Sequence, residues 1–146
     1  MFFHLNNRAL LKISGNDAKS FLQSQLSNDI NKIDYSNIQL NAYCQHQGKI
    51  LALFWVIRQE EDFYLSFPAD LLDSIQSRLK MFVIMADVTI EDVTPQLIQI
   101  GVLEEKYSPS FSINEKMSLI ILENTDLSNF DISTNDLWNH SCVDCH

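Results

Sequence analysis

Apolar and polar residues alternate over short segments of the chain, and this pattern predicts a series of strands. In residues 8–13, Ala9, Leu11 and Ile13 share one face and Leu10 lies on the other. Residues 38–45 alternate strictly, and we expect the apolar set that ends in Cys44 to face the core. The remaining predicted strands are residues 50–57, 63–67, 88–93, 96–102 and 118–122.

One of these strands is apolar on both faces. Residues 50–57 contain no polar side chain, which predicts a strand in the interior of a sheet. The preceding residues His46-Gln47-Gly48-Lys49 predict a hairpin turn, because Gly48 can supply a positive φ. Phe67 closes the next strand with an apolar side chain.

Apolar residues at helical spacing predict three helices. The first follows Gly15-Asn16-Asp17, the second begins at Pro68-Ala69-Asp70, and the third runs from about residue 133 or 134 to the end. Their apolar residues are Ala18, Phe21, Leu22 and Leu26 in the first, Leu71, Leu72, Ile75 and Leu79 in the second, and Leu137, Trp138 and Cys142 in the third.

Hairpin-linked strands interrupted by helices indicate an α+β fold with a mainly antiparallel sheet and two to three packed helices. We expect a boundary near Thr94-Pro95. Residues 1–95 then form a first α+β subdomain, and residues 96–146 begin a second one.

Composition narrows the class of protein. With 146 residues and 46% hydrophobic content, the chain can bury a core of its own. A net charge of −9 disfavours direct binding of nucleic acid or anionic lipid. The longest apolar run has eight residues, too few for a membrane helix, and the N-terminus lacks the features of a signal peptide. We therefore expect a cytoplasmic protein.

The strongest local motif is Cys142-Val143-Asp144-Cys145-His146, which matches the C-x-x-C-H pattern of covalent haem attachment. Redox-active thiols and buried helix residues are the alternatives, and the missing export signal favours buried residues. His4, His46 and His140 are available for zinc, but no spacing gathers them. No metal ligand and no catalytic residue is predicted.

Ordered segments of the chain resemble the YgfZ family. Arg8–Gly15, Asp17-Ala18 and Phe21–Ile30 are similar to the family's strand, glycine, Asp-Ala and "Phe-Leu-Gln-Gly-Gln-Leu-Thr-Asn-Asp-Val". Cys44–Ile50 resembles the family's next hairpin, "Cys, three residues, Gly-Lys", and Asn135–Cys145 resembles its Trp-bearing helix. The similarity spans about residues 5–102 and then this last segment.

The resemblance implies the fold of the glycine-cleavage T-protein superfamily and a tetrahydrofolate ligand. It also implies that iron–sulfur proteins are partners, that the protein helps to maintain them, and that it affects tRNA modification through them. In that picture Leu51 and Phe67 are wall residues of the folate pocket, and Trp138 stacks on the folate.

Three departures from the family pattern bear on function. Arg8 stands where many relatives have an aromatic residue, and Leu51 stands where T proteins have an aspartate, which disfavours aminomethyl transfer. The chain ends at His146, before the family's Lys-Gly-Cys motif. We therefore expect a truncated second subdomain and weak or absent folate binding by this chain alone. Besides a folate-binding module, an aminomethyltransferase-type enzyme and a protein-interaction domain that lost its ligand remain open.

Overall fold

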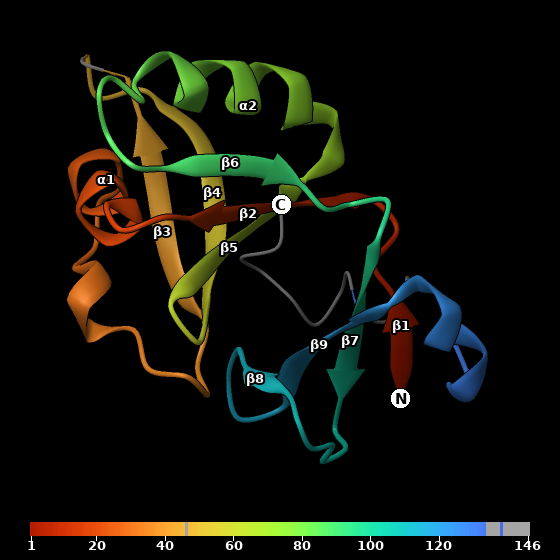
Figure 1. Ribbon diagram of the computed structural model, residues 1–146. Coiled ribbons are helices and arrows are strands. Elements are labelled where there is room, and N and C mark those ends of the chain that lie inside the picture. The colour runs from red at the N-terminus through yellow and green to blue at the C-terminus, as the bar shows by residue number, and fades with distance from the viewer. Residues whose placement is uncertain (46, 134–137, 139–146) are drawn as a thin grey trace.

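The computed structural model describes residues 1–45, 47–133 and 138. Its strands and helices follow one another in a hairpin-rich order (Figure 1). The strands are β1 (Phe2–His4), β2 (Arg8–Ser14), β3 (Gln39–Cys44), β4 (Ile50–Gln59), β5 (Asp62–Pro68), β6 (Thr89–Asp92), β7 (Leu97–Leu103), β8 (Phe111–Ser112) and β9 (Met117–Glu123). The α-helices are α1 (Ala18–Gln25) and α2 (Leu72–Met81), and the 3-10 helices are η1 (Ile30–Lys32), η2 (Ala69–Leu71) and η3 (Asn124–Asn129).

The strands form two antiparallel sheets. The larger sheet has five strands in the order β3-β4-β5-β2-β6, and the smaller has four in the order β1-β7-β9-β8. The first strand of the chain thus joins the smaller sheet, where Phe3 pairs with Gly101 of β7. This confirms the predicted α+β fold, with the antiparallel strands divided between two sheets.

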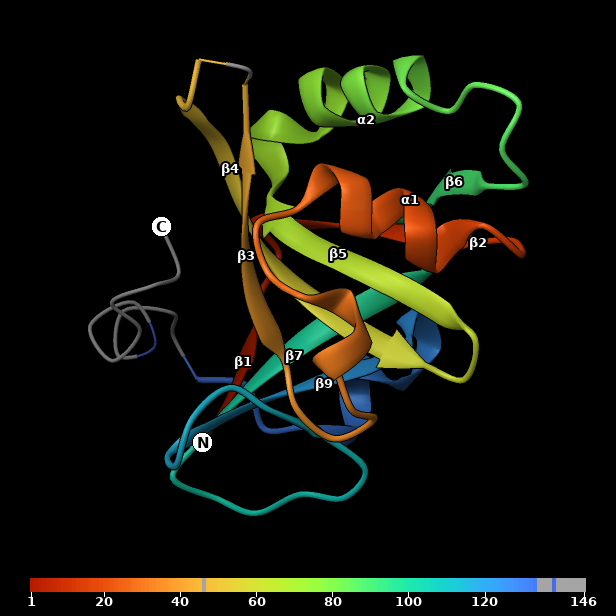
Figure 2. The same cartoon turned by 90° about the vertical axis from the view of Figure 1, so that its left-hand side faces the viewer.

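Buried side chains fall into three layers. The helix-side core lies between the larger sheet and the two α-helices, which cover the same face of that sheet (Figures 1 and 2). The inter-sheet core lies between the two sheets, and a third, small cluster lies under η3. In β2, Ala9, Leu11 and Ile13 face the helix-side core and Leu10 faces the inter-sheet core, as the alternation predicts.

The interior strand and the second helix are also confirmed. β4 lies between β3 and β5, and Gly48 of the preceding turn has a φ of 83°. In α2, Ile75 and Leu79 are buried. These elements carry the strongest apolar patterns, so tertiary packing and local pattern agree there.

The inward face predicted for β3 is wrong. Asn41 and Tyr43 are buried, whereas Cys44 is an exposed free thiol and Leu40 is 39% exposed. The Asn41 Oδ1 accepts a hydrogen bond from the Asn28 backbone N–H at 2.8 Å, and Tyr43 stacks on Phe54 with ring centroids 5.6 Å apart. An aromatic contact and a satisfied amide on one face outweigh Leu40, Ala42 and Cys44 on the other.

Several sequence predictions lie outside the described residues. They are the turn residue His46, most of the third helix, and the thiols Cys142 and Cys145. The division at residue 95 stays a prediction. Among the described residues, no helix is both long and apolar enough to cross a bilayer.

Candidate functional site

A bulge in the β3–β4 hairpin determines where Leu51 points. Tyr43 pairs with Ala52, but Cys44 pairs with Ile50, so Leu51 is an extra residue on β4. Such a bulge re-aims a side chain that regular alternation would send to the opposite face. Leu51 accordingly packs, half-buried, against the helix-side core.

Leu51 lines a groove between this hairpin and α2, which we call the hairpin groove. Its volume is about 510 Å³. It is lined by Lys49, Ile50, Leu51, Leu71, Ser74, Ile75, Ser77, Arg78 and Met81. Its surface is therefore mainly apolar, with two cations and two hydroxyls, and none of the described residues that line it is acidic. Such a groove suits a flat, partly apolar anion.

A smaller hollow of about 310 Å³, the tyrosine pocket, meets the groove at Arg78, which lines both. Its other lining residues are Ser24, Gln25, Tyr43, Cys44, Gln45 and Phe82. The Arg78 guanidinium lies 5.7 Å from the Phe82 ring centroid. Burial raises the pKa of the Tyr43 hydroxyl, an effect that the positive charge of Arg78 and a hydrogen bond with Arg78 partly oppose.

The structure separates the three residues predicted to bind folate. Phe67 is fully buried in the helix-side core, the same core against which Leu51 packs, and its ring lies 5.3 Å from that of Phe54. Trp138 lies in the inter-sheet core, on the opposite face of the larger sheet. One pocket therefore does not hold both Leu51 and Trp138.

Trp138 is packed tightly where it lies. The side chain is 2% exposed, and its ring lies 5.7 Å from Phe3 and 6.5 Å from Trp55 between centroids. A Cβ added to Gly101 would lie 2.7 Å from the Trp138 ring, so only glycine fits beneath the indole. Whether Trp138 stacks on a folate stays a prediction.

Arg8, which replaces the family's aromatic residue, takes part in a buried polar network. Its Nε donates to Ser66 Oγ and its Nη2 to the Ser66 carbonyl, both at 2.9 Å. The guanidinium carbon lies 3.9 Å from the Trp55 ring centroid, and burial lowers the pKa of Arg8 to about 10. Ser66 Oγ donates in turn to Gln99 Oε1, which connects the two sheets.

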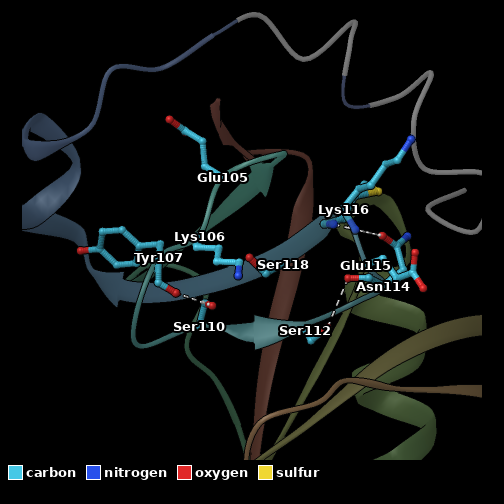
Figure 3. Close-up of a pocket in the computed structure, with 10 residues that line it drawn as sticks. Glu105, Lys106, Tyr107, Ser110, Ser112, Asn114, Glu115, Lys116 and Ser118 are labelled. Atoms are coloured by element: carbon cyan, nitrogen blue, oxygen red, sulfur yellow. Dashed lines mark hydrogen bonds between the residues drawn. The ribbon is translucent and has the colours of Figure 1, made fainter.

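A third hollow lies at the β8–β9 end of the smaller sheet (Figure 3). Its volume is about 290 Å³, and its lining includes two lysines and two glutamates, Lys106, Lys116, Glu105 and Glu115. Figure 3 shows Glu105 and Lys116 pointing away from each other. Because its charges balance and do not converge, this hollow is a poor candidate site. No cluster of three metal-binding side chains occurs among the described residues.

The sequence pattern missed the polar side chains around the groove. Alternation that directs Cys44 to the core directs Tyr43 away from it, whereas Tyr43 is buried. Arg78 follows Ile75 by three residues and so shares its side of α2, which was an available signal. Ser66 and Gln99 have no local signature, because each is defined by a contact between sheets.

Comparison of the amino-acid sequence with known proteins finds relatives of two kinds. The tRNA-modifying protein YgfZ of Colwellia psychrerythraea is 29% identical over 104 residues, which cover 71% of this chain and 32% of that protein. An aminomethyltransferase of Exiguobacterium sibiricum is 34% identical over 101 residues, which cover 68% of this chain and 28% of that protein. No protein-family model matches the chain.

The fold agrees. The glycine cleavage system aminomethyltransferase T of Bartonella henselae superposes with a TM-score of 0.71 at 14% identity, covering 98% of this chain and 45% of that one. YgfZ proteins from other bacteria also match. The chain is a YgfZ-like member of the glycine-cleavage T-protein superfamily. This YgfZ-like chain spans less than half the length of the curated relatives it matches.

Proposed function

We propose that this YgfZ-like chain belongs to a cytoplasmic folate-binding protein that supports iron–sulfur proteins and, through them, tRNA modification. In this proposal the hairpin groove is the surface that contacts the folate. The relatives' names support the tRNA connection, and the aminomethyltransferase fold supports a folate ligand. The exposed free thiol of Cys44 fits a reducing compartment.

The observation that carries the proposal is the bulge at Leu51. It places an apolar residue in a groove of about 510 Å³, within the usual size range of small-molecule sites. Folate combines a flat pterin, an aminobenzoyl ring and a glutamate. Leu51, Leu71 and Ile75 offer apolar contacts to the rings, and Lys49 and Arg78 offer positive charge to the carboxylates.

A titration of the isotope-labelled chain with tetrahydrofolate, followed by NMR, tests this surface. We expect amide shifts to concentrate at residues 49–51 and along α2, and Leu51→Asn to reduce them. Ile84→Asn is the matched control, because Ile84 is 73% exposed and does not line the groove. Shifts centred on Trp55 and Gly101 would move the ligand to the side of Trp138. No shifts anywhere would contradict folate binding and favour the protein-interaction domain.

The iron–sulfur role needs a cellular test. Deletion of the gene should lower the activity of iron–sulfur enzymes and the level of the tRNA modifications that depend on them. The wild-type gene should restore both, and a Leu51→Asn gene should restore them less well than an Ile84→Asn gene. Unchanged iron–sulfur enzyme activity in the deletion strain would contradict this role.

Aminomethyl transfer is the second candidate, because one relative carries the name aminomethyltransferase. Leu51 and the absence of acidic groove residues among those described argue against it, since no carboxylate is present there to steer the reacting amine. We expect the wild-type chain to release no ammonia from an aminomethyl donor in the presence of tetrahydrofolate. Measurable release would make this the better proposal.

A further inference from the structure

Two polar atoms in the tyrosine pocket are poorly satisfied by hydrogen bonds. Within the described part of the chain, neither the Tyr43 hydroxyl nor the Arg78 Nε has a hydrogen-bond partner of regular geometry, although both atoms are buried. The Arg78 guanidinium lies close enough to the Tyr43 hydroxyl to lower its pKa, so the two polar groups converge on the same hollow. Tyr43 is 2% exposed and lines the pocket. Buried polar groups are nearly always paired with good geometry, so two poorly satisfied groups that converge on one hollow indicate a missing ligand.

The surroundings of these two atoms define the chemistry of that ligand. Arg78 and Tyr43 offer hydrogen-bond donors, and none of the described lining residues is acidic. Neighbouring polar groups are partly engaged, since Ser24 Oγ donates to the Phe21 carbonyl and Gln25 Nε2 donates to Ser24 Oγ. The pocket therefore suits a ligand group that accepts hydrogen bonds and carries a negative charge.

A carboxylate fits better than a phosphate. The pocket has one cation and one poorly satisfied hydroxyl, which match a monoanion, whereas a phosphate dianion needs more positive charge. A guanidinium is planar and presents its N–H groups in the geometry that a carboxylate accepts. Phe82 beside Arg78 shields that contact from solvent on one side.

We propose that Tyr43 and Arg78 bind a glutamate carboxylate of the folate that occupies the hairpin groove. Arg78 lines both hollows, so a ligand lying along Leu51 can reach the tyrosine pocket past this side chain. The identity of the ligand rests on the proposed function, while the carboxylate site itself rests on the convergence of the two poorly satisfied buried groups. The bulge at Leu51 shapes the groove beside this site.

Three variants test the site by NMR titration. Arg78→Gln should weaken tetrahydrofolate binding by about tenfold to a hundredfold and Tyr43→Phe by about threefold to tenfold. Lys80→Gln removes the same charge from an exposed position of the same helix, and it should change affinity by less than about twofold. None of the three should affect binding of tetrahydropterin, which has no carboxylate.

The free chain supplies a second readout. Tyr43→Phe removes a buried hydroxyl that has no hydrogen bond of regular geometry. It should therefore leave the Tm of the free chain equal or higher, while it weakens binding of the ligand. A lower Tm with unchanged affinity would show a structural hydroxyl and overturn the inference.

The ligand fragments separate this inference from the proposed function. If tetrahydrofolate shifts the groove residues but the Tyr43 and Arg78 variants bind it normally, the carboxylate site is wrong and the folate groove stands. If tetrahydrofolate causes no shifts, the same NMR titration with p-aminobenzoylglutamate tests the carboxylate site by itself. Shifts at Tyr43 and Arg78 that the two variants abolish would keep the carboxylate site, and no shifts would overturn both.

Discussion

Gly101 and Trp138 show how tightly single residues are fitted in this fold. Gly101 sits in β7, paired with Phe3 of β1 and Leu119 of β9, and the Trp138 indole lies directly over it. Glycine is normally unfavourable inside a strand, because it loses more backbone entropy on folding than other residues and has no side chain to pack. Here the missing side chain makes room for an aromatic ring that fills the inter-sheet core.

Gly101→Ala should therefore destabilise the chain. Its new Cβ meets the Trp138 ring at 2.7 Å, and overpacking of a core costs about 1 to 3 kcal/mol. Chemical denaturation measures the loss, and tryptophan fluorescence reports the displaced indole. The double variant Gly101→Ala/Trp138→Leu should lose less than the sum of the single changes. Additive losses would show that the two residues do not share this contact.

Ser66 is the centre of the polar network between the sheets. Ser66→Ala removes an acceptor from the Arg8 Nε and a donor from Gln99, and it leaves both partners buried. We expect a loss of about 1 to 3 kcal/mol in the free energy of unfolding, measured by denaturant titration. Ser36→Ala is the control, because Ser36 lies in an exposed loop. Equal stability of the two variants would contradict the importance of the network.

At the scale of elements, the sequence pattern predicted most strands and helices but not every orientation. β4 and α2 were predictable because apolar residues dominate their buried faces. β3 was not, because both of its faces carry residues that a core accepts, and alternation alone does not choose between them. The bulge at Leu51 was also hidden, since it is defined only by pairing with Tyr43 and Cys44.

The orientation of β3 gives a paired test. Asn41→Leu adds an apolar side chain to a buried position, yet it leaves the Asn28 backbone N–H without its acceptor. We expect it to destabilise the chain by about 1 to 3 kcal/mol. Leu40 lies on the opposite face of β3, beside Trp55, and is 39% exposed, so Leu40→Asn should destabilise the chain less than Asn41→Leu. Thermal denaturation of both variants decides, and a reversed order would restore the face predicted from alternation.

At the scale of the whole molecule, the candidate site follows from the layering. The larger sheet separates Leu51 on the helix side from Trp138 on the inter-sheet side. The helix side is open at the groove beside the hairpin, while the inter-sheet side is closed around Trp138. In the described conformation Leu51 is therefore accessible to a ligand, whereas Trp138 is not.

This arrangement predicts weak binding of tetrahydrofolate by the chain alone. Of the three predicted contacts, Leu51 is accessible, Phe67 is fully buried and Trp138 is 2% exposed. Good small-molecule sites enclose most of their ligand, and a groove that offers one of three contacts cannot. We expect affinity to be at least about a thousandfold lower than that of an enclosed folate site, equivalent to about 4 kcal/mol. Because Trp138 and Trp55 lie on the other face, binding should leave tryptophan fluorescence unchanged. Calorimetry and fluorescence titration measure both quantities. Micromolar affinity with quenched fluorescence, lost in Trp138→Ala but not in Leu51→Asn, would instead place the indole in the folate site.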